Sequence, residues 1–343
     1  MLRAARDAIA ESGWGAGASP LLSGHSSLHR RLEQQLAELE RTERAVVFGS
    51  GFAANVGTVA ALVGPGDAIF SDANNHASLI DGCRLSRANV HIYRHTDAGH
   101  LAELLAAHGT AGRRLIVTDS LFSMDGVFAP LAELVELADE FDAMLLIDEA
   151  HATGVLGTRG SGLVEALGLE GRVDVRAGTL SKALGSCGGF VSGTEALAEW
   201  VTNAARPYVF STAMPAAAAA AALAALDVVR TEPERRETLA RRAGDLRERL
   251  RAEGFALGRS ESHIITLLAG EANDAVALAA ELAEQGFYVP AIRPPSVAPG
   301  TSRLRISLVH DHSPEMIDRL VAALVGLRTR STATVGQTQA API

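Results

Sequence analysis

The sequence has little cysteine and no basic tract, and each absence excludes a class of protein. The two cysteines among its 343 residues, Cys83 and Cys187, are too few for a disulfide framework and lack the spacing of metal ligands. Lysine and arginine number 31 against 40 acidic residues, and the resulting net charge of −9 argues against nucleic acid as a partner. We therefore expect a cytoplasmic protein with no bound metal.

No segment predicts a membrane helix or an export signal. The longest apolar run, residues 213–226, is mostly alanine and contains Pro215. It is also shorter than the roughly 20 residues that a membrane-spanning helix needs. The first ten residues carry Arg3, Arg6 and Asp7 instead of the apolar stretch of an export signal. The alanine-rich run predicts a buried helix, and no membrane is expected as a partner.

Lysine is rarer still. Lys182 is the only lysine, so the other 30 of the 31 basic residues are arginines. A GC-biased genome explains arginine wherever charge alone matters, but it does not explain the one exception. Arginine stays protonated and cannot form an imine, whereas a lysine amine can act as a nucleophile. We therefore expect Lys182 to carry chemistry that needs an amine, with chance survival as the alternative.

Short aliphatic runs alternate with longer amphipathic stretches over the first two thirds of the chain. Several of these runs are continuously apolar, which is typical of strands buried on both faces of a parallel sheet. The alternation predicts an α/β fold whose mostly parallel sheet has helices on both faces. The expected strands are residues 45–48, 68–71, 90–94, 115–118, 144–147, 173–178 and 189–192.

The pattern changes after the alanine-rich run. Residues 231–251 predict a charged helix, and two β-like runs at 263–268 and 304–308 follow. Helical patterns lie at 275–285 and 314–327. We predict a large domain over residues 1–227 and a smaller α+β domain over residues 228–330. Residues 331–343 are poor in bulky apolar side chains and are predicted to be disordered.

In open α/β sheets, ligands bind at the carboxyl ends of the strands. The glycine-rich run 49–54 follows the first predicted strand and matches G-x-G-x-x-A, with Asp72 further on. This weak dinucleotide fingerprint makes a nicotinamide-dependent oxidoreductase an alternative. A tight turn explains the small residues equally well, and the start of a helix can bind any phosphate.

Three further side chains suggest a different cofactor. Asp148 follows the strand 144–147, where it could cap a helix or pair with a protonated ring nitrogen, and His151 would face the same cavity. His76 is either an ordinary surface histidine or a ring that stacks on a flat cofactor. With Lys182 and a phosphate-binding helix start, these residues describe a pyridoxal phosphate site.

Arg303, Arg305 and Ser307 alternate along the last predicted strand and therefore share one face of it. Two guanidinium groups on that face could bind the carboxylate of a substrate. The alternative is an exposed edge strand that carries charges to prevent edge-to-edge pairing.

Several segments, in their order along the chain, resemble the α-oxoamine synthases. These are fold-type I pyridoxal phosphate enzymes that condense an amino acid with an acyl thioester and release carbon dioxide. The resemblance covers residues 12–327 and implies a seven-stranded sheet with a smaller C-terminal domain. The segments are SGFAAN (50–55), NHASLIDG (75–82), FSMDG (122–126), IDEAHATG (147–154), GTLSKALG (178–185) and FSTAMP (210–215).

The resemblance implies a role for each residue that surrounds the cofactor ring. Lys182 would form the Schiff base and later move the α-proton. Asp148 would keep the pyridine nitrogen protonated, and His76 would stack over the ring. His151 and Ser123 would hydrogen-bond to the phenolate oxygen of the ring.

The resemblance also implies a phosphate site and a second subunit. The backbone amides of Gly51 and Phe52, with the hydroxyls of Thr179 and Ser181, would hold the phosphate. Thr212 would reach the phosphate of a neighbouring subunit, which implies a homodimer with a shared active site.

For the substrates, the resemblance implies that Arg305 binds the carboxylate of the amino acid. Arg293 and Ser296 would lie in the substrate-binding loop, and His76 would also contact the substrate. Asp119 belongs to this set and replaces a glutamate that is common in the family. Because aspartate is shorter, we expect Asp119 to reach its partner through water.

Within the family, SGHSSLH (23–29) and residues 291–308 are similar to members of biotin biosynthesis. The resemblance therefore implies condensation of L-alanine with pimeloyl-CoA or a pimeloyl carrier protein to 8-amino-7-oxononanoate. The family pattern includes a further N-terminal segment that covers the site, so we expect a more open acyl site or a truncated start.

Several alternatives stay open. The chain could be another α-oxoamine synthase, such as a glycine C-acetyltransferase or a 5-aminolevulinate synthase. It could also be an inactive relative that lacks the covering segment. A nicotinamide enzyme leaves Lys182, Asp148 and His151 without a role.

Overall fold

The computed structural model describes residues 1–108 and 112–338, which form two compact units. The first unit comprises Met1–Phe122 and Ala129–Pro233, and the second comprises Ser123–Phe128 and the chain from Glu234 onward. The predicted boundary between residues 227 and 228 lies inside helix α10 (Ala216–Thr231). The last turn of α10 stays with the first unit because Val229 packs against the core of that unit.

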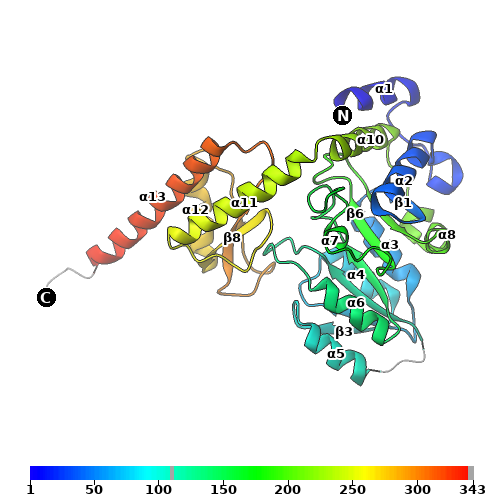
Figure 1. Cartoon of the computed structure of the whole chain (residues 1–343), viewed down its shortest axis with the longest axis horizontal. Helices are drawn as coiled ribbons and strands as arrows, with labels where there is room; N and C mark the ends of the chain where they lie inside the picture. The colour runs from blue at the N-terminus through cyan, green and yellow to red at the C-terminus, as the bar shows by residue number, and fades with distance from the viewer. Residues whose placement is uncertain (109–111, 339–343) are drawn as a thin grey trace. The chain divides into compact units, whose positions relative to one another are not determined.

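A seven-stranded sheet forms the centre of the first unit, in the order β1-β7-β6-β5-β4-β2-β3 (Figure 1). Only β7 runs antiparallel to its two neighbours, and the remaining strands are parallel to one another. The predicted α/β fold with a mostly parallel sheet is confirmed. The strands are β1 (Arg44–Phe48), β2 (Ala68–Asp72), β3 (Asn89–Tyr93), β4 (Arg114–Asp119), β5 (Met144–Asp148), β6 (Val175–Thr179) and β7 (Gly189–Gly193).

Helices cover both faces of this sheet. One apolar core includes residues of α3, α4 and α8, and a second includes residues of α2 and α10. Leu32 and Leu36 of α2 are fully buried one turn apart, and each such side chain contributes roughly 1.5–3 kcal/mol of hydrophobic stabilisation. The helices are α1 (Leu2–Ser12), η1 (Pro20–Gly24), α2 (Ser27–Glu40), α3 (Gly51–Leu62), α4 (Ala77–Ser86), α5 (Ala98–Ala107), α6 (Leu131–Glu140), α7 (Leu163–Ala166), α8 (Glu195–Ala204), α9 (Arg206–Val209) and α10.

The alanine-rich run forms α10, whose alanines are largely buried, as expected. Helix α1 packs on it through small side chains, with Ala8 against Ala217 and Ala220. Within residues 1–108 and 112–338, no helix combines the length and the apolar composition that crossing a membrane requires.

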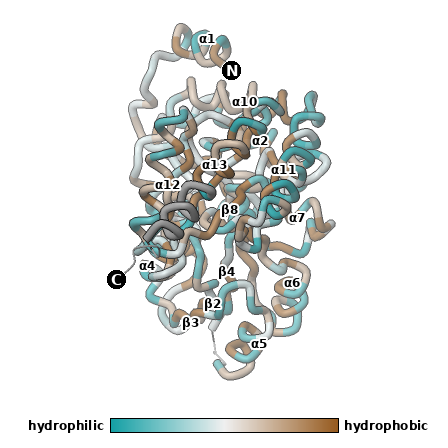
Figure 2. Tube along the Cα trace, turned by 90° about the vertical axis from the view of Figure 1, so that its left-hand side faces the viewer, coloured by the Kyte–Doolittle hydropathy of each residue, from teal (hydrophilic) through white to brown (hydrophobic). Residues whose placement is uncertain are grey.

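The second unit has a three-stranded antiparallel sheet in the order β8-β10-β9. Its helices include the charged α11, whose hydrophilic composition can be followed in Figure 2. The strands are β8 (Ile264–Gly270), β9 (Ala291–Ile292) and β10 (Ser302–Ser307), and the helices are α11 (Glu234–Ala252), α12 (Ala272–Glu284) and α13 (Pro314–Thr338).

Helix α13 runs further than the sequence pattern predicts. It continues past residue 327 to Thr338 and so includes residues 331–338, for which we predicted disorder. The alanine, serine and threonine residues of this stretch are compatible with a helical backbone. Residues 339–343 of the same predicted tail lie outside the described residues.

Candidate cofactor and active site

The loops that follow β5 and β6 bring Lys182 and His151 together. Lys182 Nζ lies 2.9 Å from His151 Nε2. Strands β5 and β6 are parallel neighbours, so the loops after them meet at the same edge of the sheet. The amine of Lys182, the only lysine of this chain, therefore lies at the carboxyl edge of the sheet, where a ligand is expected.

Asp148, the last residue of β5, presents a buried carboxylate at this edge. The residue is only 4% exposed, and both of its carboxylate oxygens accept hydrogen bonds. Asn55 Nδ2 donates to Oδ2 at 2.6 Å, and the backbone N–H of Ala150 donates to Oδ1 at 2.8 Å. The helix-cap alternative does not hold, because the next helix, α7, begins only at Leu163.

Glu149 anchors the loop that carries His151. Its carboxylate accepts from the Ser120 hydroxyl at 2.6 Å and from the backbone N–H groups of Leu163 and Val164 at 3.0 and 2.7 Å. Burial raises the pKa of Glu149, and these hydrogen bonds oppose the rise. A glycine is needed at position 162, because a Cβ there would lie 2.5 Å from the Glu149 carboxyl carbon.

Asp119, the last residue of β4, holds the start of α4. Its Oδ2 accepts from the backbone N–H of His76 at 2.7 Å. This contact is direct and is made to a backbone amide, so the expectation that Asp119 reaches its partner through water stays a prediction. Burial raises the pKa of Asp119, and the Asp148 carboxylate, its neighbour across β4 and β5, raises it further.

The His76 side chain lies near both Asp148 and Lys182. Burial lowers its pKa, the Asp148 carboxylate opposes this, and the Lys182 charge lowers it further. Its Nδ1 lies 2.7 Å from the Ser78 hydroxyl. The Phe52 ring meets the His76 ring edge-on, with 6.4 Å between ring centroids. His76 is therefore oriented by contacts on several sides.

Small residues and hydroxyl groups come together at the start of α3. Backbone packs directly on backbone there, because a Cβ on Gly189 would lie 2.4 Å from Gly51 Cα. The hydroxyls of Thr179 and Ser181 are 2.7 Å apart, and a Cβ on Gly51 would lie 3.3 Å from Thr179 Cβ. The first amides of a helix have no partner within it, so Gly51 and Phe52 can donate to an anion together with these hydroxyls.

Thr212 lies in an exposed part of the first unit. The backbone N–H of its neighbour Ala213 donates to Ala18 O at 2.9 Å, which joins this segment to the one after α1. Large apolar side chains are exposed on both segments: Phe210 is 71% exposed and Trp14 is 68% exposed.

The structure places Ser123 in the second unit, beside Arg305 of β10. Arg305 Nε donates to the Ser123 carbonyl at 2.5 Å, and its Nη1 donates to the Ser307 hydroxyl at 2.8 Å. Burial lowers the pKa of Arg305. Arg303, on the same strand, donates instead to the carbonyl of Thr301. The two arginines of β10 therefore have different partners.

Arg293 and Ser296 are exposed residues of the turn after β9. The backbone N–H of Ser296 donates to Arg293 O at 3.1 Å.

The second unit also contains His263, which no sequence pattern marked. Burial lowers the pKa of His263 to about 4, and the Arg305 charge acts in the same direction.

Sequence reasoning also missed Asn55, Ser78 and Glu149 as parts of the first unit's site. Each lies inside a segment that carries the family resemblance: SGFAAN, NHASLIDG and IDEAHATG. The signal was therefore present, but only the structure shows which backbone and side-chain atoms these residues hold.

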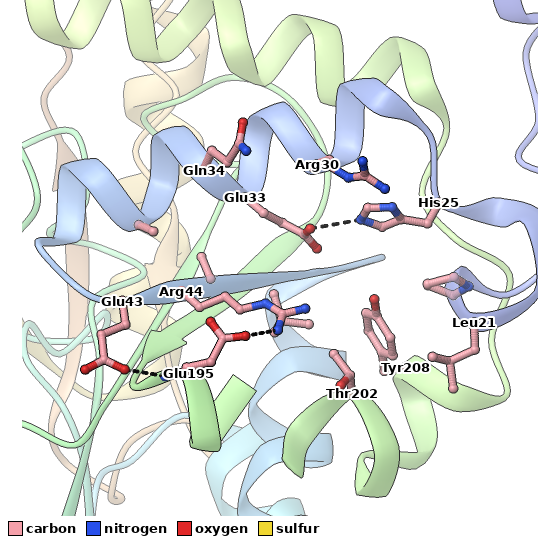
Figure 3. A pocket seen from close by; sticks show the side chains of 14 residues that line it. Leu21, His25, Arg30, Glu33, Gln34, Glu43, Arg44, Glu195, Thr202 and Tyr208 are labelled. Atoms are coloured by element: carbon pink, nitrogen blue, oxygen red, sulfur yellow. Dashed lines mark hydrogen bonds and ion pairs between the residues drawn. The ribbon is translucent and has the colours of Figure 1, made fainter. Parts of the chain in front are cut away.

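A separate pocket of about 550 Å³ lies between α2 and β1 (Figure 3). Its lining contains none of the predicted site residues. Two pairs of charged groups line it, His25 with Glu33 at 2.9 Å and Arg44 with Glu195 at 2.5 Å. Size alone therefore does not mark the place where the chemistry of this chain is concentrated.

Comparison with protein families gives a match over nearly the whole described chain. Residues 1–324 match the family model of class I and II aminotransferases. An 8-amino-7-oxononanoate synthase from Anaeromyxobacter dehalogenans is 51% identical over 324 residues, which make up 94% of this chain and 81% of that protein.

Solved structures resemble the fold. A serine palmitoyltransferase (SPT) structure with a pyridoxal phosphate internal aldimine superposes with a TM-score of 0.92 at 35% identity, covering 95% of this chain and 82% of the other. An 8-amino-7-oxononanoate synthase from Francisella tularensis superposes with a TM-score of 0.81 at 27% identity, covering 96% and 93%.

Proposed function

The chain belongs to the class I and II aminotransferase family, and we propose that it is a pyridoxal phosphate-dependent C-acyltransferase that makes 8-amino-7-oxononanoate in biotin biosynthesis. The observation that carries this proposal is the position of Lys182, whose amine lies 2.9 Å from His151 Nε2 at the edge where Asp148 ends β5. A nicotinamide enzyme would leave this arrangement without a role.

The residues at this edge fit pyridoxal phosphate. The Asp148 carboxylate, buried and held by two donors, is suited to a protonated ring nitrogen. Gly51 and Phe52 at the start of α3, with Thr179 and Ser181, would hold the phosphate. Lys182 would hold the cofactor covalently, and His151 would bind its phenolate oxygen.

Each residue then has a defined task in the reaction. The bound cofactor supplies an electron-poor ring that takes up the electron pair left on the amino acid when a bond to its α-carbon breaks. When the amino group of the substrate replaces Lys182 on the cofactor, the freed Lys182 Nζ would take the proton from the α-carbon as general base and return a proton at the end. His151 Nε2, 2.9 Å away, orients that amine. His76, whose ring lies near Asp148 and Lys182, would stack over the ring.

The substrates are an amino acid and an acyl thioester. Arg305 binds the carboxylate of the amino acid, which a guanidinium can contact through two parallel N–H groups. Its Nε already donates to Ser123 O and its Nη1 to Ser307, so the guanidinium is oriented before the substrate arrives. Arg293 and Ser296 would lie in the substrate-binding loop, and Ser123 is proposed to contact the cofactor.

L-Alanine and a pimeloyl thioester, carried on CoA or on a carrier protein, are the specific substrates that we propose. The support is the 51% identity to an 8-amino-7-oxononanoate synthase, against 35% to the serine palmitoyltransferase. The latter nevertheless superposes better, with a TM-score of 0.92 against 0.81 for the Francisella tularensis synthase. We give sequence identity more weight, because one fold serves different substrates and the site residues decide between them.

We further propose that the enzyme is a homodimer in which Thr212 reaches the phosphate site of the partner subunit. Support comes from the exposed apolar side chains beside Thr212, including Phe210 and, on the segment joined to it through Ala18, Trp14. Large apolar side chains that are exposed on a monomer can belong to a surface that a protein partner covers.

The proposed function is tested by supplying pyridoxal phosphate, pimeloyl-CoA and one amino acid at a time. We expect release of free CoA and formation of 8-amino-7-oxononanoate, detected by mass spectrometry, with L-alanine. Glycine and L-serine should give little product. A preference for serine would favour the palmitoyltransferase-like alternative, and bound cofactor without any turnover would indicate an inactive relative.

A further inference from the structure

A chain of hydrogen bonds connects His76 to Asp148 through the side chains of Ser78 and Asn55. Ser78 Oγ lies 2.7 Å from His76 Nδ1 and 2.9 Å from Asn55 Nδ2. Asn55 Nδ2 also lies 2.6 Å from Asp148 Oδ2. Ser78 and Asn55 are buried, at 0% and 2% exposure. Water therefore does not compete for these bonds.

The donors and acceptors of these hydrogen bonds can be assigned from Asp148 outward. An ionised carboxylate can only accept hydrogen bonds, so Asn55 must present its NH₂ group and not its carbonyl. One amide hydrogen goes to Asp148 Oδ2 and the other to Ser78 Oγ. The Asn55 carbonyl oxygen is left buried without a hydrogen-bond partner. The two acceptors therefore determine the orientation of this amide.

Ser78 is the next donor in this series of hydrogen bonds. Its oxygen accepts from Asn55, so its single hydrogen is available for His76 Nδ1. The backbone N–H of Ser78 also donates to His76 Nδ1, at 3.3 Å. Two donors that converge on one ring nitrogen require a lone pair on that nitrogen. The hydrogen of the neutral imidazole must then be on Nε2.

We propose that Ser78 and Asn55 are positioning residues that keep His76 neutral, with its hydrogen on Nε2, and couple its ring to Asp148. The charged groups around His76 do not determine its protonation state alone, because Asp148 favours the imidazolium and Lys182 disfavours it. Asp119 holds only the backbone N–H of His76. A proton on Nδ1 would face both Ser78 donors, which is why the neutral form is retained.

The tautomer is a property of the chain itself and does not depend on the proposed function. Only its use, the presentation of a fixed ring and its Nε2–H to a bound cofactor, rests on that function. The two ideas can therefore fail independently, and the test below measures the ring nitrogens directly instead of turnover.

The test is two-dimensional ¹H–¹⁵N NMR of ¹⁵N-histidine-labelled protein near neutral pH, with and without pyridoxal phosphate. Signals of His76, one of 11 histidines, are assigned by their loss in His76→Gln. We expect an unprotonated Nδ1 and a protonated Nε2 in both samples. A protonated Nδ1, or an imidazolium near neutral pH, would overturn the proposal. This result needs only the wild-type protein.

Variants then test the two positioning residues. Ser78→Ala should lower the ratio of Nε2–H to Nδ1–H tautomer about tenfold, the scale of one hydrogen bond, and raise the pKa of His76. Asn55→Ala should move both in the same direction, and Ser78→Thr should restore the wild-type values. Ser86→Ala is the matched control, because Ser86 is a buried serine of α4 that donates to Cys83 O and not to His76. Equal effects of Ser78→Ala and Ser86→Ala would contradict the proposal.

Discussion

Lys182 Nζ and His151 Nε2 are 2.9 Å apart, although the two residues are 31 positions apart in the sequence. The contact exists because β5 and β6 are parallel neighbours and end at the same edge of the sheet. This contact positions the amine, and a catalytic amine has to be positioned to act on one proton.

Replacement of Lys182 should remove both covalent cofactor binding and turnover. Lys182→Ala and the charge-conserving Lys182→Arg should each reduce turnover by roughly 10⁴–10⁶-fold, the scale seen when a nucleophile is removed from an enzyme. Borohydride reduction of the wild-type protein with pyridoxal phosphate, followed by mass spectrometry, should label Lys182. Because the chain has no other lysine, label found only at the amino terminus would contradict the assignment.

Asp148→Asn should retain the fold and lose most of the activity. The amide can still accept from Ala150 N–H but cannot keep a ring nitrogen protonated, so we expect a loss of roughly 10²–10³-fold in kcat, the scale of a preorganised charge. Asp174→Asn is the control, because Asp174 also accepts a backbone N–H, that of Leu145 at 2.8 Å, at the start of β5. Comparable losses in the two variants would refute a specific role for Asp148.

Arg305→Ala should affect the amino acid more than the thioester. Loss of a charged hydrogen-bond donor to a carboxylate typically costs about 1.5–3 kcal/mol, so KM for L-alanine should rise roughly 10- to 100-fold. KM for the thioester should change little. Arg303→Ala, on the same strand, should have a small effect, because Arg303 donates to Thr301 O. An unchanged dependence on alanine in Arg305→Ala would remove this residue from the substrate site.

His263 should make the folded state sensitive to acid. Burial lowers its pKa to about 4 from the ordinary 6.5, so the unfolded chain binds a proton on this residue at a higher pH than the folded chain does. Stability should therefore fall as the pH drops from 6.5 toward 4, by up to roughly 3 kcal/mol from this residue. Urea unfolding of the wild type and of His263→Gln at several pH values should show a weaker acid dependence in the variant. Parallel curves would show that His263 does not contribute.

The proposed shared site predicts complementation between two inactive variants. Lys182→Ala removes the amine of a subunit's own site, whereas Thr212→Val removes the group that the subunit lends to its partner. Hybrid dimers of the two should contain one intact site and regain part of the wild-type activity, while each variant alone stays impaired. Sedimentation should show a dimer in every case. A monomer, or mixtures no more active than the separate variants, would contradict the shared site.

Much of this protein could be predicted from its sequence, because the relevant signals are local. Continuous apolar runs predicted the strands of the sheet, and the lone lysine marked Lys182 before any comparison was made. The segments around Asp148 and His151 predicted a cofactor that the family and its solved structures share. Composition and periodicity report burial and residue chemistry directly, so these inferences needed no knowledge of tertiary contacts.

Other features were decided only by the tertiary structure. Nothing in the sequence shows that the Asp119 carboxylate holds the His76 amide, or that Asn55 donates to Asp148. The extent of α10 and the place of Ser123 with Arg305 are likewise set by packing and by hydrogen bonds between distant segments. The sequence determined which chemical groups are present and which strands carry them. The fold alone determined which atoms meet, because hydrogen-bond geometry depends on the distances between segments that are far apart along the chain.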